Sequence, residues 1–188
     1  NAGMKYVIFT TKHHDGFCMF DTATTDYKIT DERCPFSRNP RSNIAKEIFT
    51  AFRNKGFWVG AYFSKPDWHS PDYWWPYFPP ADRNVNYNVI KYPERWERFV
   101  RFTHSQIEEI MTDYGRIDIL WLDGGWVRPY TPEEIRVYKS HPDFKQPNLQ
   151  NQDIRMGEIV RAAREKQPGL IVVDRAVEGP YQNYITPE

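Results

Sequence analysis

The sequence alternates between strand patterns and helix patterns, and this alternation most constrains the fold. Near-continuous apolar, β-branched or aromatic runs, typical of parallel strands covered on both faces, occur at residues 6–10, 57–63, 117–122 and 170–173. Amphipathic helix patterns lie between them, at residues 43–55, 93–114 and about 153–166. The middle helix is the clearest, because Pro93 stands at its start and Gly115 just past its end. The order β-α-β-α-β-α-β predicts an α/β protein.

Loop lengths indicate which α/β architecture this is. Long loops follow the first three strands, at residues 12–41, 64–92 and 124–152, and the third contains a short helical segment that we expect to begin at Thr131. The turns that lead from helix into strand are short. This asymmetry is typical of a (β/α) barrel, in which the loops leaving the strands carry the site. A doubly wound open sheet is the main alternative, but no Gly-x-Gly-x-x-Gly motif follows any strand, which argues against its dinucleotide-binding version.

Four strands with their helices make only about half of an eight-stranded barrel. The 188 residues suffice for one domain with a sizeable core. An open half-barrel would leave edge strands and a bare apolar face. We therefore expect residues 1–188 to be part of a single catalytic TIM-like (β/α)₈ barrel domain, with the rest of the barrel and any C-terminal domain outside this chain.

Composition excludes several classes of function. Lys plus Arg and Asp plus Glu are balanced at 25 each, so neither a nucleic-acid partner nor an anionic membrane is indicated. No apolar run approaches the roughly 18–20 residues of a membrane span. Two cysteines make neither a disulfide framework nor a zinc site. There is no phosphate-binding loop, and no Ser or Cys stands in a nucleophile elbow.

Aromatic residues make up 16% of the chain, and many of them fall in one loop. That loop carries Trp68, Tyr73, Trp74, Trp75, Tyr77 and Phe78. Aromatic rings placed among Pro and Asp can form a rigid wall around a ligand. They can equally be simple loop packing, and the sequence leaves the two interpretations open.

Asp123 is the first candidate for chemistry. It ends the strand at 117–122, is followed by Gly124 and Gly125, and has indoles on both sides. A carboxylate at the carboxyl end of a barrel strand is placed where active sites form. The alternative is an Asp that only caps its own turn. Asp118, near the start of the same strand, is expected to be structural.

A pair of histidines, His13 and His14, follows the first strand. Adjacent residues on a strand point to opposite faces, so the two imidazoles are not expected to chelate one metal unless the backbone has left the strand. No third ligand stands at metal-site spacing, so we predict no metal. Neutral imidazoles suit the binding of hydroxyl groups.

The later strands end in further candidates, and the full set indicates a class of reaction. These candidates are Tyr62, Asp67, Trp68 and His69 after the second strand and Asp174 and Arg175 after the fourth. Arg175 is expected to anchor an oxygen-rich ligand or to hold Asp123 ionised, with Asp174 as its structural partner. A carboxylate beside aromatic platforms and hydroxyl-binding groups is the equipment of glycoside hydrolysis.

These residues also form motifs that resemble the α-L-fucosidases of glycoside hydrolase family 29. The resembling segments occur in order over essentially the whole chain, and they are Tyr6 to Phe17 with Lys12-His13-His14-Asp15-Gly16, Gly60 to Ser64 followed by Asp67-Trp68, Trp121 to Gly124, Val172 to Arg175, and Tyr184 to Glu188. The resemblance implies a retaining exo-glycosidase that releases terminal α-L-fucose from a fucosylated oligosaccharide or glycoconjugate, without metal or organic cofactor.

The resemblance also assigns roles to particular residues. Asp123 would be the nucleophile, and the substrate-binding residues would be His13, His14, Tyr62, Arg175 and, as part of the pocket wall, Trp68. The general acid/base is either Glu188, the last residue, or a glutamate outside the chain. Because the retaining mechanism uses two carboxyl groups roughly 5 Å apart, the chain as given is expected to lack most activity.

Two other functions stay open at this stage. One is a carbohydrate-binding protein on the same barrel that has lost hydrolysis, although a lectin has no need of the carboxylate of Asp123. The other is a barrel glycosidase that acts on a different sugar. By analogy with the family, an exported location is expected, whether periplasmic, secreted or lysosomal. The fucosyl linkage, the aglycone and the oligomeric state do not follow from the sequence.

Overall fold

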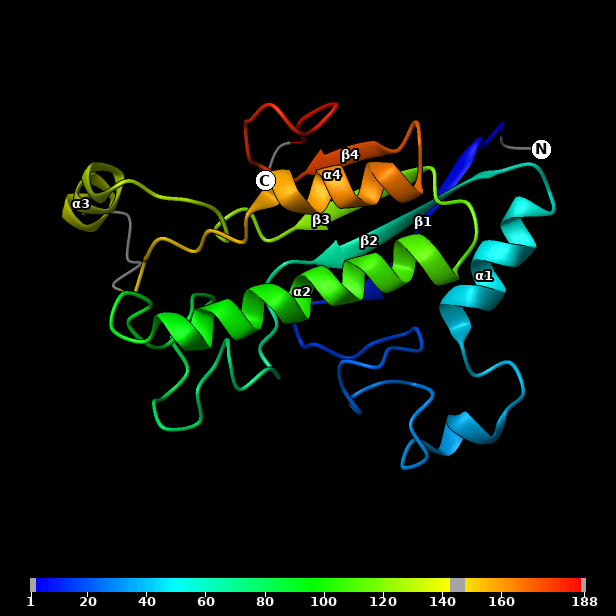
Figure 1. The fold of residues 1–188 in the computed structure, drawn as a ribbon, viewed down its shortest axis with the longest axis horizontal. Helices are drawn as coiled ribbons and strands as arrows, with labels where there is room; N and C mark the ends of the chain where they lie inside the picture. Colours follow the sequence, from blue (N-terminus) through cyan, green and yellow to red (C-terminus); the bar gives the residue numbers. More distant parts are fainter. Residues whose placement is uncertain (1–2, 143–147, 187–188) are drawn as a thin grey trace.

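The computed structural model describes residues 3–142 and 148–186, and its centre is a four-stranded parallel sheet (Figure 1). The strands are β1 (Tyr6–Lys12), β2 (Trp58–Ser64), β3 (Ile119–Asp123) and β4 (Ile171–Asp174). The helices are η1 (Pro35–Arg38), α1 (Ile44–Arg53), α2 (Pro93–Asp113), α3 (Pro132–Ser140) and α4 (Met156–Lys166). The alternation predicted from the sequence is confirmed.

The strand order distinguishes the barrel from the open sheet. It runs β1-β2-β3-β4 without reversal, and every neighbouring pair is parallel. Right-handed crossovers between strands in this order place all the connecting helices on one face. A doubly wound sheet needs a reversal of the order, so the described sheet is part of a barrel wall and the open-sheet alternative is wrong.

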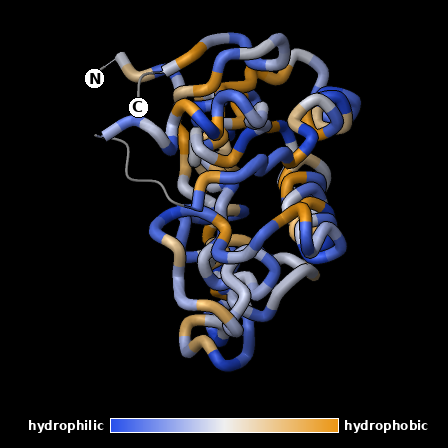
Figure 2. Tube along the Cα trace, turned by 90° about the vertical axis from the view of Figure 1, so that its left-hand side faces the viewer, coloured by the Kyte–Doolittle hydropathy of each residue, from blue (hydrophilic) through white to orange (hydrophobic). Residues whose placement is uncertain are grey.

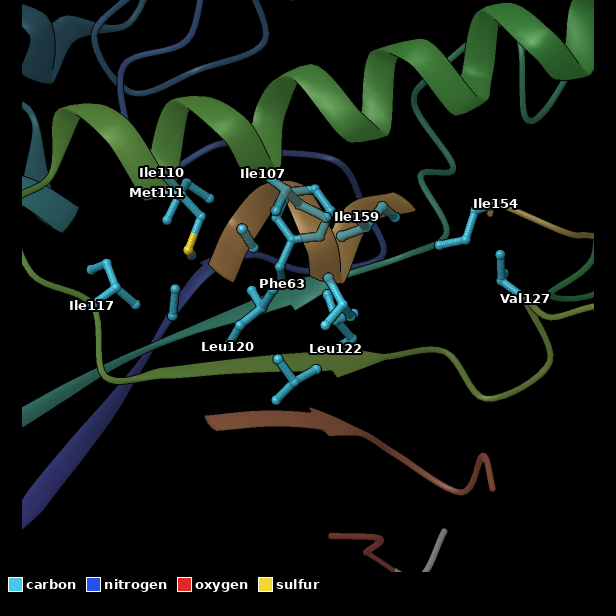
Figure 3. Close-up of a cluster of buried hydrophobic side chains, with 14 of the residues drawn as sticks. Phe63, Ile107, Ile110, Met111, Ile117, Leu120, Leu122, Val127, Ile154 and Ile159 are labelled. Carbon is cyan, nitrogen blue, oxygen red and sulfur yellow. The ribbon is translucent and has the colours of Figure 1, made fainter. Parts of the chain in front are cut away.

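Register shows which side chains face the helices. Phe9, Ala61, Leu120 and Val172 stand side by side across the four strands. Phe9 packs edge-on against Phe49 of α1, with ring centroids 6.2 Å apart. Leu120 points with Phe63 toward α2 and α4 in Figure 3. The hydrophobic core therefore lies on the helix-facing side of the sheet. The residues that alternate with these along each strand point to the opposite side, which is the barrel interior.

The core lies between the sheet and the paired helices α2 and α4. Figure 3 shows Ile107 and Ile110 of α2 and Ile159 of α4 meeting the side chains of β2 and β3. These helix residues are at most 3% exposed. In Figure 2 the helices on one side of the molecule carry alternating hydrophobic and hydrophilic stretches, as an amphipathic helix requires. No helix among the described residues is long and apolar enough to cross a membrane.

The helix at Thr131 forms as predicted. The Thr131 side chain accepts a hydrogen bond from the Glu134 backbone, and the Glu134 side chain accepts one from the Thr131 backbone, which is a capping box. α3 lies away from the sheet, beyond one end of it (Figure 1). It belongs to the loop region that follows β3.

Candidate active site

The site is built at the carboxyl ends of the four strands, where Asp123 is the central group. Asp123 is the last residue of β3, and it is 4% exposed. Its backbone is held from both sides, because the Lys65 amide donates to the Asp123 carbonyl at 2.9 Å and the Arg175 amide donates to the Leu122 carbonyl at 2.9 Å. The carboxylate therefore projects from a fixed strand end rather than from a mobile loop.

The turn after Asp123 needs glycine. Gly124 has φ +91°, and a Cβ there would lie 2.4 Å from Cδ of Pro66. Any larger residue would meet both backbone strain and a steric clash. The Gly124 amide donates to Oδ1 of Asp123 at 2.7 Å. The turn thus orients one carboxylate oxygen directly.

Two further groups bind the same carboxylate. The Tyr62 hydroxyl donates a short hydrogen bond to Oδ2 of Asp123. The Arg175 guanidinium lies 3.5 Å from Oδ1 and 3.4 Å from Oδ2. Burial pushes the Asp123 pKa upward, but the hydrogen bonds from Tyr62 and Gly124 and the charge of Arg175 outweigh it and lower the pKa below its usual value. Asp123 is therefore an anion at neutral pH. Burial and the neighbouring carboxylate raise the Tyr62 pKa, so its phenol keeps its proton.

Both histidines lie on the same side of the site, because the backbone has left the strand, which is the exception that the prediction allowed. β1 ends at Lys12, and the chain turns at His14 and Asp15, so the alternation of a strand no longer applies. The ring centroids of His13 and His14 are 4.2 Å apart. His13 stacks on Tyr62 at 5.8 Å with an interplanar angle of 4°. Nε2 of His14 lies 3.9 Å from Oδ2 of Asp123.

His13, His14 and Asp123 could also be considered as metal ligands. Their ligating atoms lie within 4.8 Å of one another. The guanidinium of Arg175, however, places a positive charge 3.4 Å from Oδ2 of Asp123, and it would repel a cation bound there. Hydrogen bonds from Tyr62 and Gly124 already occupy the carboxylate. The arrangement suits hydroxyl groups better than a metal ion.

Two indoles form the wall beside His14. Trp68 and Trp126 each have a ring centroid 5.2 Å from that of His14. The Arg83 carbonyl accepts hydrogen bonds from Nε1 of Trp126 at 2.9 Å and from Nε1 of Trp68 at 3.5 Å. A single backbone oxygen thus fixes both rings, which leaves a flat apolar surface next to an imidazole.

The rest of the aromatic loop is mainly packing rather than wall. Tyr73 is fully buried in the core. Trp74 stacks on the back of Trp68 at 5.2 Å, and Trp75 packs among Phe78, Tyr87 and Tyr92. Of the two interpretations that the sequence left open, loop packing holds for these residues. The rings that stand against His14 are those of Trp68 and Trp126, and a ligand wall there stays a prediction.

Other sequence candidates lie outside the site. Asp67 is buried against Lys12 at 3.1 Å, and His69 stacks on Tyr27 at 3.8 Å. Asp118 accepts a hydrogen bond from the Val59 amide at 2.9 Å, as expected of a structural residue. Glu188 lies outside the described residues.

Asp174 is not the partner of Arg175, which corrects a prediction. Neighbouring residues at a strand end point to opposite faces. Arg175 reaches Asp123 in the barrel interior, whereas Asp174 faces the core and pairs with Lys65 at 2.5 Å.

Sequence reasoning gave no role to Lys65, which pairs with Asp174, or to Ser64, whose hydroxyl contacts His14. A polar pair that follows directly on a buried strand was the signal that could have identified them.

The fold and the site together define a class of protein. It is a (β/α) barrel whose strand ends assemble one ionised, buried carboxylate with two imidazoles, a guanidinium and indole walls. Such a carboxylate can attack an electrophilic carbon, while the neighbouring groups hold a ligand rich in hydroxyls.

Comparison with known proteins identifies the family. The family model described as alpha-L-fucosidase matches residues 1–188. Alpha-L-fucosidase 1 of Arabidopsis thaliana is 32% identical over 124 residues, which are 66% of this chain and 20% of that protein. The structure of alpha-L-fucosidase isoenzyme 1 from Paenibacillus thiaminolyticus matches with a TM-score of 0.63 and 35% identity, over 92% of this chain and 35% of that one. The chain belongs to the alpha-L-fucosidase family.

A third similar structure bears on chemistry. It is a trapped covalent intermediate of a GH29 alpha-L-fucosidase from Bacteroides thetaiotaomicron, in complex with 2-fluoro-fucosyl fluoride. It matches with a TM-score of 0.61 and 25% identity, over 90% of this chain and 31% of that one. This chain therefore spans about a third of the length of these two solved structures and a fifth of the Arabidopsis relative.

Proposed function

We propose that the protein containing this chain is a retaining exo-glycoside hydrolase that releases terminal α-L-fucose from glycans. The observation that carries the proposal is the state of Asp123, a buried anion at the end of β3 that three donors orient toward the barrel interior. The covalent intermediate trapped in the Bacteroides relative supports the same reaction type. The structure of alpha-L-fucosidase AlfC from Lactobacillus casei in complex with the alpha-L-fucose product, 29% identical to this chain, supports fucose as the released sugar.

In this mechanism Asp123 attacks the anomeric carbon of fucose, and the bond to the aglycone oxygen breaks as the glycosyl-Asp ester forms. A water molecule then cleaves the ester and regenerates the carboxylate. Tyr62 and Arg175 disperse the charge of Asp123 before attack and hold its orientation. His13 and His14 take hydrogen bonds from the sugar, and Trp68 supplies an apolar surface for a ring face.

The reaction needs a second carboxyl group that protonates the leaving oxygen. We propose Glu188 or a glutamate outside these 188 residues for this role. A Glu188→Gln variant of the full-length protein separates the two. If Glu188 is the acid, the variant loses turnover of natural glycans and keeps burst release from an activated aryl fucoside, because a good leaving group needs no proton. Unchanged turnover of both substrates assigns the role to another residue.

We also propose that the chain forms part of one catalytic barrel domain. Tyr6 and Trp58, which stand in register on the interior face of β1 and β2, are 54% and 52% exposed. Further strands of the barrel would cover these rings. Limited proteolysis of the full-length protein tests the proposal, because a single domain yields no stable fragment that ends near residue 188.

An exported location is proposed by family analogy alone. Fractionation of cells that express the full-length protein tests it, and retention in the cytoplasm would contradict it.

An assay of the full-length protein on a chromogenic α-L-fucoside tests the proposed function. We expect turnover by the wild type, competition by fucose but not by galactose, and loss of turnover in Asp123→Asn. Binding of fucose without turnover by the wild type would favour the carbohydrate-binding alternative. Equal competition by galactose would favour a glycosidase for another sugar.

A further inference from the structure

Ser64, the last residue of β2, connects the core of the sheet to the site. It is fully buried. Its hydroxyl oxygen lies 2.6 Å from Nδ1 of His14, and the hydroxyl donates to the Pro66 carbonyl at 2.8 Å. None of the sequence predictions gave Ser64 a role.

Counting the protons available shows which atom donates in each of the two hydrogen bonds made by the Ser64 hydroxyl. A serine hydroxyl has one proton, and a proline carbonyl can only accept. If the Ser64 proton turned toward His14, lone pairs of two oxygens would face each other at 2.8 Å in a buried place where water cannot intervene. The Ser64 proton therefore lies on the bond to Pro66, and Nδ1 of His14 is the donor to Ser64.

The protonation of His14 then determines what its other nitrogen can do. Burial, with help from His13, lowers the pKa of His14 to about 4, so the ring carries a single proton at neutral pH. That proton is on Nδ1. Nε2 consequently presents a lone pair 3.9 Å from Oδ2 of Asp123.

We propose that Ser64 is a positioning residue that holds His14 in the Nδ1–H tautomer, so that Nε2 accepts a hydrogen bond from a sugar hydroxyl beside Asp123. This proposal rests on the proposed function for the identity of the ligand. The tautomer itself is a property of the unliganded protein.

The tautomer matters because of what the other form would do. With its proton on Nε2, His14 would point an N–H dipole at Oδ2 of Asp123, 3.9 Å away. That dipole would stabilise the anion in the ground state and reduce its nucleophilicity. Holding the proton on Nδ1 leaves the carboxylate to its three present donors and adds an acceptor for the substrate.

Nitrogen-15 NMR of histidine side chains in the full-length, unliganded protein at pH 7 tests the tautomer, with His14 assigned by the loss of its signals in His14→Gln. We expect a protonated Nδ1 and a bare Nε2 in the wild type. In Ser64→Ala we expect the proton to redistribute toward Nε2. Ser64→Thr keeps the hydroxyl and should keep the wild-type tautomer. Ser70→Ala removes another buried serine hydroxyl, one that accepts from the Asp72 amide, and should leave His14 unchanged.

Kinetics with monodeoxy α-L-fucosides test the acceptor role. Removal of one particular fucose hydroxyl should lower the kcat/KM of the wild type roughly tenfold, as expected for one lost hydrogen bond. Removal of the same hydroxyl should lower the kcat/KM of Ser64→Ala much less. A protonated Nε2 in the wild type would overturn the proposal, and this result does not depend on whether the serine variants fold. An unchanged tautomer in a folded Ser64→Ala would also overturn it. If the tautomer is as expected but no fucoside is turned over, the proposed function fails and the assignment of Ser64 stands.

Discussion

The ammonium of Lys65 lies 2.5 Å from a carboxylate oxygen of Asp174, and neither side chain is more than 4% exposed. This pair spans the outer side of β3 at the level of Asp123, on the face opposite to the contact between Asp123 and Arg175. Burial raises the pKa of Asp174 and lowers that of Lys65, so both charges depend on the pairing. The ends of β2 and β4 are therefore coupled across the strand that carries the proposed nucleophile.

Breaking this pair should destabilise the protein strongly. Lys65→Met leaves the carboxylate of Asp174 buried without a partner, and we expect a loss of about 3–5 kcal/mol in the free energy of unfolding. The double variant Lys65→Met, Asp174→Leu removes both charges and should recover most of that loss. Denaturant titration of the single and double variants checks the prediction. Additive losses would contradict it.

Gly124 should be intolerant of any side chain. Gly124→Ala meets positive φ and a Cβ contact of 2.4 Å with Pro66, whereas Gly169→Ala has φ +88° and no atom within 4 Å of its Cβ. We expect Gly169→Ala to cost about 1 kcal/mol of stability and Gly124→Ala clearly more, with a loss of kcat/KM because Oδ1 of Asp123 moves. Equal stability and activity in the two variants would show that Pro66 exerts no steric constraint.

Tyr62→Phe should shift the acid limb of the pH profile. Asp123 must be ionised to attack, so kcat/KM falls as pH drops through the Asp123 pKa. The Tyr62 hydrogen bond lowers that pKa, so removing the hydroxyl should raise the pKa and move the limb to higher pH. Measurement of kcat/KM from pH 3 to 8 checks the shift, with Tyr77→Phe at a 76% exposed position as the control. A limb that stays in place or moves to lower pH would contradict the assignment.

His14 should make the protein less stable in acid. Its pKa is about 4 in the folded protein against 6.5 as the ordinary value, so between these pH values the unfolded chain binds more protons than the folded one. The free energy of unfolding should fall as pH decreases from 6.5 to 4, and this contribution is fully present above 6.5. Thermal melting of wild type and His14→Gln at pH 7 and pH 5 checks the sign. We expect a smaller acid-induced drop in Tm for the variant, and an identical drop would refute the linkage.

Periodicity was enough to predict the elements of this fold and their order. Near-continuous apolar runs indicated the parallel strands, and Pro93 with Gly115 delimited α2 to within one residue of its observed end at Asp113. The contrast between long and short loops favoured the barrel, but the doubly wound sheet stayed open until the strand order excluded it. The signals for the elements are local in the sequence, whereas the order of the strands in the sheet is tertiary information.

The site was predictable only where a strand stayed regular. Asp123 and Arg175 follow from strand ends, but the shared side of His13 and His14 does not, because the chain leaves β1 after Lys12. The predicted pairing of Asp174 with Arg175 was wrong because it relied on their adjacency in the sequence, although adjacent residues at a strand end point to opposite faces. The roles of Ser64 and Lys65 depend on contacts with residues 50 and 109 positions away, which no local pattern reveals.

The central claim is that Asp123 forms a covalent bond to the sugar, and trapping the intermediate tests it most directly. The full-length protein is incubated with 2-fluoro-fucosyl fluoride, digested, and its peptides are sequenced by mass spectrometry. We predict one added 2-fluoro-fucosyl group, carried by Asp123 and absent from Asp123→Asn. A label on any other residue of an enzyme that the reagent inactivates would contradict the account.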